Sequence, residues 1–314
     1  MTEEFYHQPV LLAETLAALK PRAGGLYVDG TVGGAGHAQA LLQQAPDIRL
    51  IGLDQDETAL KAAAARLAPF GERVQLYHSN FTQIKQVLFA LGWSATPLAG
   101  VLLDLGVSSP QLDTAQRGFS YMKNGPLDMR MDRNTSITAA DIVNTWEEAE
   151  LARILYEYGE EKWAKRIAAF IVAERQLAPI ETTLQMVSVI KKAVPKGARE
   201  ADQHPAKRSF MALRIAINNE LTALSQGLDS AQELLEKGGR LAVISFNSLE
   251  DRIIKDKFNY WARSCVCPPQ FPVCVCGHTP EMKVINRRPV VAGKEETTQN
   301  PRAKSAKLRA AEKL

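Results

Sequence analysis

The segment from Leu26 to Asp56 (LYVDGTVGGAGHAQALLQQAPDIRLIGLDQD) constrains the fold of the chain more than any other stretch. It reads as a short apolar strand at 26–29, a loop with four glycines, a helix at 38–44 and a second apolar strand at 50–53. Glycine allows the backbone to turn at positive φ or to approach a ligand closely. The N–H groups of a helix that starts at such a loop face the same ligand. The segment therefore predicts half of a nucleotide-binding βαβ unit in an α/β protein.

The glycine spacing and two acidic residues indicate which nucleotide this loop would bind. The dinucleotide motif G-x-G-x-x-G is broken, because Gln39 occupies the position of its third glycine. The Lys-Ser/Thr pair of a phosphate-binding P-loop does not follow either. Asp29 before the glycines and Asp54 after the next strand suit a ligand with a cationic centre and a ribose. S-adenosylmethionine has both, and a glycine-rich turn in an ordinary α/β protein is the alternative.

Polar or aromatic residues stand at the ends of four predicted strands. Besides Asp29 and Asp54, Phe81 follows a third strand at 74–78, and Asp104 comes at the end of a fourth, continuously apolar strand at 100–105. In open parallel sheets ligands bind beyond the carboxyl ends of the strands, so these side chains are expected at one site. Phe81 either stacks on a flat base or belongs to the core, and both interpretations stay open.

The chain changes character after residue 110. Residues 111–224 show no convincing strand, and helices are expected at 139–145, 149–158, 162–174, 183–193 and from His204 through Leu224. Sheet character returns with a fifth strand at 239–246, a helix at 250–262 and a last strand near 283–287. The predicted organisation is a sheet domain at 1–110 and 216–293, a helical insertion at 111–215 and a basic tail at 294–314. The tail has too little apolar content to fold alone, so it is either disordered or laid along the protein or RNA.

The charge distribution favours a polyanionic partner without requiring one. Residues 1–105 carry a net charge of −3 and residues 106–314 a net charge of +6. A basic excess of this size is explained equally well by solubility alone. No run approaches 18 apolar residues and the polar N-terminus lacks the regions of a signal peptide, so a cytoplasmic protein without membrane spans is expected. A homodimer is left open.

All four cysteines lie in the segment CVCPPQFPVCVC, as Cys265, Cys267, Cys274 and Cys276. In a cytoplasmic chain such a cluster is not a disulfide framework. Thiolates brought together by a proline-rich turn can hold zinc. The C-x-C spacing is tighter than the usual C-x₂₋₄-C, and on a strand it places both sulfurs on one face. Buried thiols on a hairpin are therefore favoured over zinc.

Eight longer blocks of the chain resemble the small-subunit ribosomal RNA methyltransferase H family, also called MraW. The blocks are HQPVLLAE at 7–14, VDGTVGGAGHA at 28–38, LLDLGVSSPQLD at 102–113, RGFSYMKNGPLDMRMD at 117–132, YGEEKWAKRIA at 158–168, HPAKRSFMALRIAINNEL at 204–221, GGRLAVISFNSLEDR at 238–252 and NPRAKSAKLRAAEK at 300–313. They follow one another in order over most of the chain, and those between 102 and 132 are long and specific.

The resemblance implies a class I, Rossmann-like methyltransferase sheet with an all-helical domain inserted after the fourth strand. It implies transfer of a methyl group from S-adenosylmethionine to N4 of a cytidine in the decoding region of 16S rRNA, with that RNA or the small ribosomal subunit as partner. The implied cofactor contacts are Gly33, Ala35, Gly36, His37, Asp54, Phe81, Asp104 and Gln111. The catalytic candidates are Asp104, Ser108, Ser109 and Asn247. The residues of the insertion expected to face RNA are Arg117, Arg130, Arg133, Lys207, Arg208 and Arg214.

Two positions depart from the family pattern. Ala35 stands where the family usually has glycine, so it either keeps negative φ or tolerates strain. Asn247 stands where the family usually has histidine, and if that histidine accepts a proton, this chain lacks the acceptor. The rival functions are therefore a methyltransferase for DNA or a protein amine, and a non-catalytic or altered-specificity RNA-binding or ribosome-assembly protein that keeps the cofactor fold. A nicotinamide dehydrogenase is disfavoured by Gln39.

Overall fold

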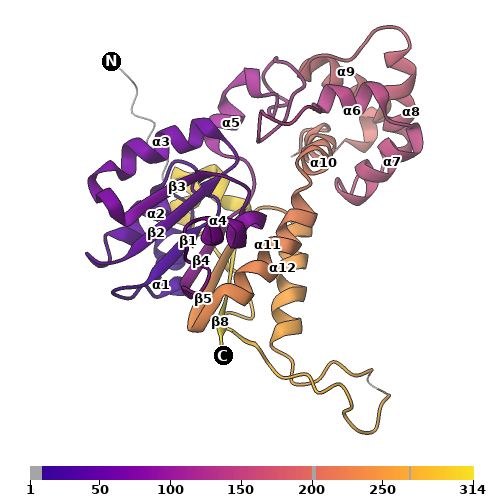
Figure 1. Cartoon of the computed structure of the whole chain (residues 1–314). Helices are drawn as coiled ribbons and strands as arrows, with labels where there is room; N and C mark the ends of the chain where they lie inside the picture. The colour runs from indigo at the N-terminus through magenta and orange to yellow at the C-terminus, as the bar shows by residue number, and fades with distance from the viewer. Residues whose placement is uncertain (1–8, 200–202, 269) are drawn as a thin grey trace. The chain divides into compact units, whose positions relative to one another are not determined.

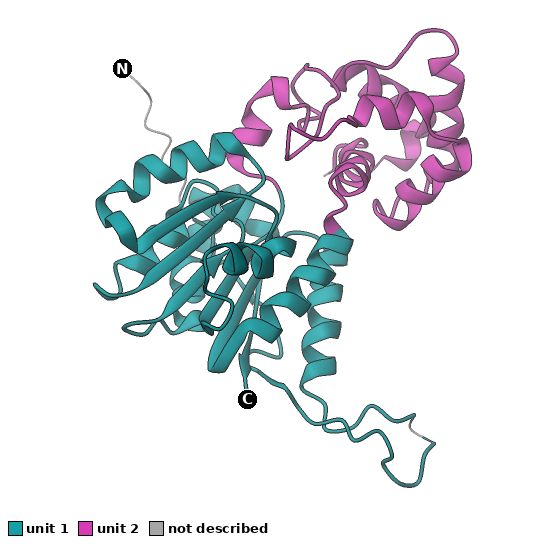
Figure 2. Ribbon diagram, viewed as in Figure 1, with its two compact units in different colours: residues 1–106, 221–314 teal, residues 107–220 magenta. Residues whose placement is uncertain are grey.

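The computed structural model describes residues 9–199, 203–268 and 270–314. The chain divides into unit 1, residues 1–106 with 221–314, and unit 2, residues 107–220 (Figure 2). His7 and Gln8, which open the first block of the family resemblance, lie outside the described residues. The boundaries differ from the expected ones at 110 and 215. The second boundary lies at 220 instead of 215, because Arg214 and Asn218 make their side-chain contacts within residues 129–220.

Unit 1 is built on one mixed sheet with the strand order β3-β2-β1-β4-β5-β8-β6, in which β7 also pairs with β8 (Figure 1). The strands are β1 (Leu26–Asp29), β2 (Arg49–Asp54), β3 (Val74–His78), β4 (Leu98–Asp104), β5 (Leu235–Ser245), β6 (Met282–Val284), β7 (Val290–Val291) and β8 (Lys307–Lys313). The first five are parallel, and β8 is antiparallel to β5, β6 and β7. The chain runs outward from β1 to β3 and then continues on the other side of β1. The topological switch point therefore lies between β1 and β4, where open sheets bind ligands.

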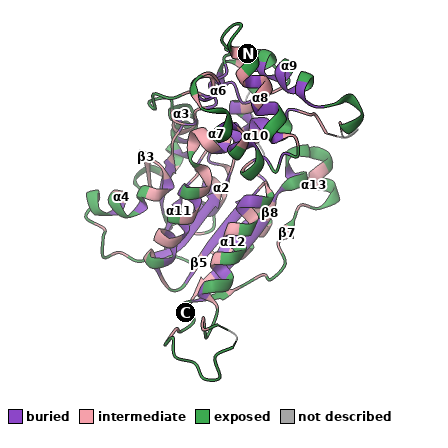
Figure 3. Ribbon diagram, turned by 90° about the vertical axis from the view of Figure 1, so that its right-hand side faces the viewer, coloured by how far each residue is buried: buried purple, intermediate pink, exposed green. Residues whose placement is uncertain are grey.

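Helices cover both faces of this sheet, as the continuous apolar strands predict. The helices of unit 1 are α1 (Leu12–Leu19), α2 (Gly36–Leu42), α3 (Glu57–Leu67), α4 (Ile84–Ala90), α11 (Glu220–Leu234), α12 (Ser248–Trp261) and α13 (Lys294–Gln299), with the 3₁₀ segments η1 (Ala68–Arg73), η2 (Phe81–Gln83) and η5 (Pro301–Ser305). Leu26 and Val28 pack with α4, α11 and α12, whereas Tyr27 packs with α1, α2 and α3. The central strands are accordingly buried (Figure 3). The strand order and the helices on both faces of the sheet confirm the predicted Rossmann-like fold class.

Unit 2 is helical in its described part. It contains α5 (Ser109–Asp113), α6 (Ala139–Thr145), α7 (Glu148–Glu157), α8 (Ala164–Arg175), α9 (Thr183–Ala193) and α10 (Lys207–Asn218), with η3 (Ala115–Arg117) and η4 (Lys196–Ala198). Leu155, Ile167 and Ile190 are fully buried in its own core. Within residues 107–199 and 203–220 the one β pairing is an isolated bridge between Pro126 and Thr182. Across all the described residues, no helix has the length and apolarity needed to cross a membrane.

The single helix expected from His204 through Leu224 is in fact two helices. α10 ends at Asn218, Asn219 adopts a φ of 50°, and α11 begins at Glu220. A residue in the left-handed region ends an α-helix, and asparagine occupies this region more readily than most residues. The apolar spacing continues across Asn219, so periodicity alone does not reveal the break.

The predicted basic tail is part of the sheet. Residues 307–313 form β8, which pairs with β5 along one edge and with β6 and β7 along the other. Leu308, Ala310 and Ala311 are buried, and the buried Arg309 donates to Asp251 of α12 (Nε to Oδ1, 2.6 Å). Of the alternatives left open, the tail lies along the protein, but its separation from the sheet domain is wrong, because backbone pairing and a buried ion pair, rather than a long apolar run, hold it in the sheet.

Candidate active site

The acid at the end of β2 holds the glycine loop in place. Asp54 accepts hydrogen bonds from the backbone N–H of Gly33 at Oδ2 (2.8 Å) and from that of Asp56 at Oδ1 (2.9 Å). Gly33 and Ala35 have φ angles of 49° and 60°, so the loop passes twice through the left-handed region. Ala35 therefore tolerates strain, at a cost of about 1–2 kcal/mol, and does not keep a negative φ. Each carboxylate oxygen has a second lone pair, so Asp54 keeps acceptor capacity for ribose hydroxyls.

Thr31 joins the ends of β1 and β4. Its N–H donates to Oδ1 of Asp29 (3.1 Å), and its hydroxyl oxygen accepts from the N–H of Asp104 (2.6 Å). The N–H of Gly30 donates to the carbonyl of Leu102 in the neighbouring strand (2.9 Å). Asp29 and Asp104 thus stand at adjacent strand ends, at the switch point of the sheet. Thr31 lies within the block at 28–38, but the sequence did not single it out as a link between strands, because a threonine after a strand has many other uses.

Two buried polar atoms at these strand ends have no hydrogen-bond partner in the described part of the protein. One is Oδ1 of Asp104, at the end of β4, and the other is Nδ2 of Asn247, which follows the end of β5. The two strands are neighbours, with Asp104 in register with Ile244. Buried polar groups in native proteins nearly always have partners. The two atoms therefore fit a ligand that presents a donor to Asp104 and an acceptor to Asn247.

The carboxyl groups around the switch point have raised pKa values. Burial, together with the nearby charges of Asp29 and Glu250, raises the pKa of Asp104 to about 8. Burial, only partly offset by the N–H of Thr31, raises the pKa of Asp29 to about 7. Burial also raises the pKa of Asp54. A cationic ligand favours the ionised form of each carboxyl, so this end of the sheet is suited to positive charge.

His37 lies in the first turn of α2 and is buried. Its Nε2 is 2.9 Å from the carbonyl oxygen of Val10, which can only accept, so Nε2 carries the proton. Its Nδ1 lies 3.7 Å from Oδ2 of Asp104, which is too long for a hydrogen bond. The ring is thus fixed with Nδ1 toward Asp104. Direct contacts of Gly36 and His37 with a cofactor stay predictions.

Asn247 is the N-cap of α12. Its Oδ1 accepts from the N–H groups of Leu249 (3.0 Å) and Glu250 (2.9 Å), and Oε2 of Glu250 accepts in return from the N–H of Asn247 (3.3 Å). This reciprocal arrangement is a capping box, and Asn followed three residues later by Glu is its readable sequence signal. With Oδ1 occupied, the remaining polar group of Asn247 is the buried N–H₂ donor. The side chain therefore cannot accept a proton.

Phe81 lies mostly in the core. Its side chain is 7% exposed and belongs to the apolar cluster on the α11 face of the sheet. A Cβ on Gly227 of α11 would lie 2.4 Å from the Phe81 ring, so the ring occupies the space that this glycine leaves. These contacts support the core interpretation of Phe81. Stacking on the base of a cofactor stays a prediction.

The other predicted contacts after β4 belong to unit 2. Ser108 is the N-cap of α5, with Oγ accepting from the N–H of Gln111 (3.4 Å), and Oε1 of Gln111 accepts from the N–H of Ser108 (2.9 Å). Ser109 and Gln111 are buried. The structure gives Ser108 and Gln111 a role in starting the helix. Their predicted catalytic and cofactor roles, and that of Ser109, stay predictions.

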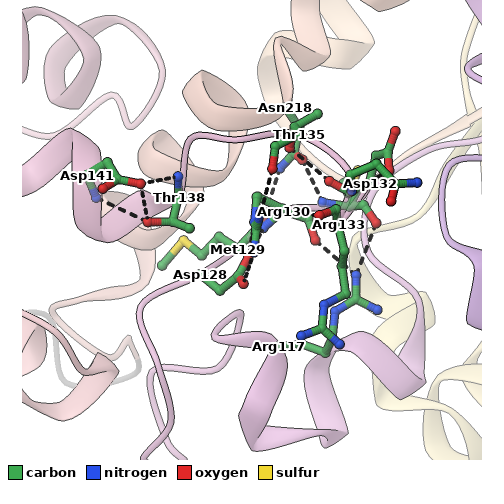
Figure 4. A network of polar contacts seen from close by, with 12 residues as sticks. Arg117, Asp128, Met129, Arg130, Asp132, Arg133, Thr135, Thr138, Asp141 and Asn218 are labelled. Carbon is green, nitrogen blue, oxygen red and sulfur yellow. Dashed lines mark hydrogen bonds and ion pairs between the residues drawn. The ribbon is translucent and has the colours of Figure 1, made fainter.

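Three of the arginines expected to face RNA have partners inside unit 2. Arg117 is buried and donates from Nη2 to the carbonyl oxygens of Arg130 (2.9 Å) and Met131 (3.1 Å) (Figure 4). Arg130 forms a two-pronged pair with Asp128, at 2.9 Å from Nε and 2.8 Å from Nη2. Arg214 pairs with Glu220 in the same way, at 2.8 and 2.9 Å. These contacts stabilise the loop at 128–135 and the end of α10. Contact of the three side chains with RNA stays a prediction.

The remaining basic residues of that set are more accessible. Arg133 and Lys207 are exposed and Arg208 is half-buried, so their predicted contact with RNA stands as a prediction. Asn218, expected on the same stripe as Lys207 and Arg214, accepts from the N–H of Met131 (2.8 Å) and is therefore structural. Sequence spacing could not separate these cases, because the partners of Arg214 and Asn218 become neighbours only through the fold.

The four cysteines converge in the loop between α12 and β6. Their Sγ atoms all lie within 4.8 Å of one another. Three of the side chains are exposed and Cys267 is half-buried, and the described residues of the loop form no strand. The expected hairpin of buried thiols is therefore wrong, because the described residues of 263–281 are mostly exposed and provide no core in which to bury them.

Comparison with known proteins identifies the family. The model of the MraW methylase family matches residues 4–314. The chain belongs to the MraW methylase family. Relatives named ribosomal RNA small subunit methyltransferase H include those of Symbiobacterium thermophilum (57% identical, covering 99% of this chain and 97% of that protein), Heliobacterium modesticaldum (56%, 99% and 99%) and Geobacter sulfurreducens (57%, 99% and 99%). The family resemblance is confirmed, and this MraW methylase is a methyltransferase enzyme.

Proposed function

We propose that this MraW methylase transfers a methyl group from S-adenosylmethionine to N4 of a cytidine in the decoding region of 16S rRNA. The names of the full-length relatives support small-subunit ribosomal RNA as the substrate. The block resemblance supports the N4 position and the decoding region. Of the rival substrates, neither DNA nor a protein amine is favoured by a particular contact among the described residues.

The observation that carries the cofactor assignment is the pair of buried atoms without partners at the ends of β4 and β5. Oδ1 of Asp104 can accept from a cationic or N–H donor, and Nδ2 of Asn247 can donate. Asp54 keeps acceptor capacity beside the glycine loop, where a ribose is expected. When bound, S-adenosylmethionine supplies a strongly electrophilic methyl group. Its positive charge would favour the ionised forms of Asp29 and Asp104, whose pKa values are raised mainly by burial.

The residues of the chain then have to position the acceptor rather than activate it strongly. The N4 amine of cytosine is a weak nucleophile, because its lone pair is delocalised into the ring. Holding it in line with the reacting methyl group is therefore the main contribution of the protein. Asp104 can stabilise the positive charge that develops on the amine as the bond forms. No residue has to act as a strong base, since the proton can leave after transfer, so Asn247 in place of histidine is compatible with activity.

The target base must be unpaired or turned out of its stack to reach the strand ends. Incubation of the purified chain with methyl-labelled S-adenosylmethionine and either free 16S rRNA or isolated small subunits tests the proposal. We expect label in RNA, recovered as N4-methylcytidine after nuclease digestion and mass spectrometry. Asp104→Asn keeps an acceptor oxygen but cannot ionise, so it is expected to weaken S-adenosylmethionine binding about 10- to 100-fold by removing the charge from this interaction. Asp104→Ala is expected to abolish methylation.

Asp256→Asn is the matched control, since this carboxyl is exposed on α12 of the same unit. It is expected to bind and methylate like the unaltered chain. Calorimetry that detects no uptake of S-adenosylmethionine or of its demethylated product would refute the cofactor assignment. Uptake without any label in either RNA would favour the altered-specificity or non-catalytic alternative instead.

A further inference from the structure

The loop between α12 and β6 holds its shape without a hydrophobic core. Among the described residues of 262–281 there is no helix or strand, and nearly all side chains are exposed (Figure 3). Its large apolar residues Phe271, Val273 and Val275 are 49%, 71% and 72% exposed. The base of the loop is closed by the N–H of Glu281, which donates to the carbonyl of Trp261 (2.8 Å). Irregular segments of this length are uncommon in compact domains unless something else orders them or they have a function.

The four thiols have the spacing of ligands around one metal ion. Sγ of Cys276 lies 3.6 Å from that of Cys274 and 3.8 Å from that of Cys265, and all four sulfurs lie within 4.8 Å of one another. A disulfide would bring two sulfurs to about 2.05 Å. Four sulfurs at about 2.3 Å from a tetrahedral zinc ion are instead about 3.8 Å apart. A cluster of several irons would hold its cysteine sulfurs farther apart than a single ion does.

Backbone N–H groups point at three of the sulfurs. Val266 donates to Sγ of Cys276 (3.4 Å), Cys267 to Sγ of Cys265 (3.4 Å), and Val275 to Sγ of Cys267 (3.3 Å). Such donors stabilise the thiolate, which is the form that binds metal, and they orient the ligand.

The backbone around the cysteines accommodates the tight C-x-C spacing. Gly277 has a φ of 61°, which lets the backbone turn directly after Cys276. The sulfurs of both C-x-C pairs lie within 4.8 Å of one another, so each pair can present both of its sulfurs to a common centre.

We propose that Cys265, Cys267, Cys274 and Cys276 bind one structural zinc ion, which orders residues 262–281 in place of a hydrophobic core. Four thiolates in a tetrahedral arrangement select zinc over magnesium or calcium, which prefer oxygen ligands. Four protein ligands leave no open coordination position, so the ion has a structural rather than a catalytic role. Zinc binding needs neither the cofactor nor RNA and is independent of the proposed function.

Elemental analysis of the full chain, purified without added metal or chelator, is expected to find one zinc ion per chain and no stoichiometric iron. All four cysteines of the protein lie in this loop, so titration with a thiol reagent reports this site alone. In the untreated protein the thiols are expected to react at least about tenfold more slowly than after a strong chelator has removed the zinc, because bound thiolates are shielded. Refilling with cobalt(II) is expected to give the visible absorption of a tetrahedral tetrathiolate centre.

The double variant Cys274→Ser/Cys276→Ser removes half of the ligands and is expected to lose the zinc and to leave Cys265 and Cys267 rapidly reactive. The matched control Val273→Ser/Val275→Ser changes the same segment but keeps the thiols, and it is expected to retain zinc. If the cysteine variant does not fold, the chelator experiment on the unaltered chain still decides. The proposal is overturned by a chain without stoichiometric zinc, by iron in its place, by zinc that persists in the cysteine variant, or by thiols equally reactive before and after chelation.

Discussion

At the scale of single residues, the two polar atoms of the Asn247 side chain differ in their surroundings. Its Oδ1 caps α12, and its Nδ2 is buried without a partner in the described structure. Asn247→Ser keeps a good N-cap but removes the amide donor, so we expect near-normal stability and a rate of methylation lowered about 2- to 10-fold, as for one neutral hydrogen bond. Asn247→Ala also loses the cap and should destabilise the chain by a further ~1 kcal/mol.

Thermal unfolding and initial rates of methylation for the three proteins separate the two roles. If the amide contacts the ligand, the serine variant loses rate while its melting temperature is kept. If Asn247 is only a cap, the serine variant should be indistinguishable from the unaltered chain, and the donor role is then excluded.

The raised pKa of Asp104 makes cofactor binding depend on pH. With a pKa of about 8 the carboxyl is largely protonated in the ligand-free protein below that pH. A cationic ligand favours the carboxylate, so binding releases the proton, and the affinity for S-adenosylmethionine should rise with pH toward 8, by at most about tenfold per unit. The same direction holds for Asp29, whose pKa is about 7. Calorimetry at about pH 6, 7 and 8 measures this rise.

Asp104→Asn cannot ionise and is the control for this pH dependence. We expect its affinity to rise less steeply with pH, with only the contribution of Asp29 left. An equal slope in both proteins would show that Asp104 keeps the same protonation state when the cofactor binds.

At the scale of elements, the sequence predicted the parallel part of the sheet well. β1, β2 and β4 contain short apolar runs buried on both faces, whereas β3 (VQLYH) is only partly buried. Because the carboxyl ends of parallel strands meet at one edge of a sheet, Asp29, Asp54 and Asp104 were expected at the same end, where they lie. The antiparallel β8 was not predicted, because its alternation of basic and small residues becomes a strand only between β5 and β6. The break at Asn219 was hidden for a similar reason. A change of one backbone angle leaves the apolar spacing intact.

The candidate site shows the same limit of sequence reasoning. The acidic residues at the carboxyl ends of the strands were predicted to lie together, and they do, because the topology of a parallel sheet brings these ends to one edge. Whether an arginine faces solvent depends on how the backbone turns between it and its partner. Arg214 and Glu220 are only 6 residues apart, but they meet across the break at Asn219, and Arg117 meets Met131, 14 residues on, across an irregular loop. The sequence also did not predict that the four thiols converge, because the C-x-C spacing alone fits both a hairpin and a metal site.

At the scale of the whole molecule, the basic excess lies outside the helical unit. Residues 107–220 carry 16 Lys/Arg and 15 Asp/Glu, a net charge of +1, whereas residues 221–314 carry 15 and 10, a net charge of +5. Arg287, Arg288, Lys294 and Lys304 are exposed on the C-terminal part of unit 1. RNA binding depends mainly on contacts between phosphates and exposed basic side chains. We therefore expect this C-terminal segment to contribute more to the electrostatic part of RNA binding than unit 2 does.

Two variants test which part of the protein contributes more to RNA binding. The triple variant Arg287→Ala/Arg288→Ala/Lys304→Ala removes exposed charges of the C-terminal segment, and the double variant Arg133→Ala/Lys207→Ala removes the exposed basic residues predicted to contact RNA in unit 2. In titrations of RNA at several salt concentrations, the slope of log affinity against log salt should become shallower by about one for each phosphate that the variant no longer neutralises. We expect the slope to fall by about two to three in the triple variant and by about one or less in the double variant. The opposite result would be an unchanged slope in the triple variant and a slope reduced by about two in the double variant. It would mean that Arg133 and Lys207 of unit 2 contact the RNA phosphates, although the net charge of that unit is close to zero.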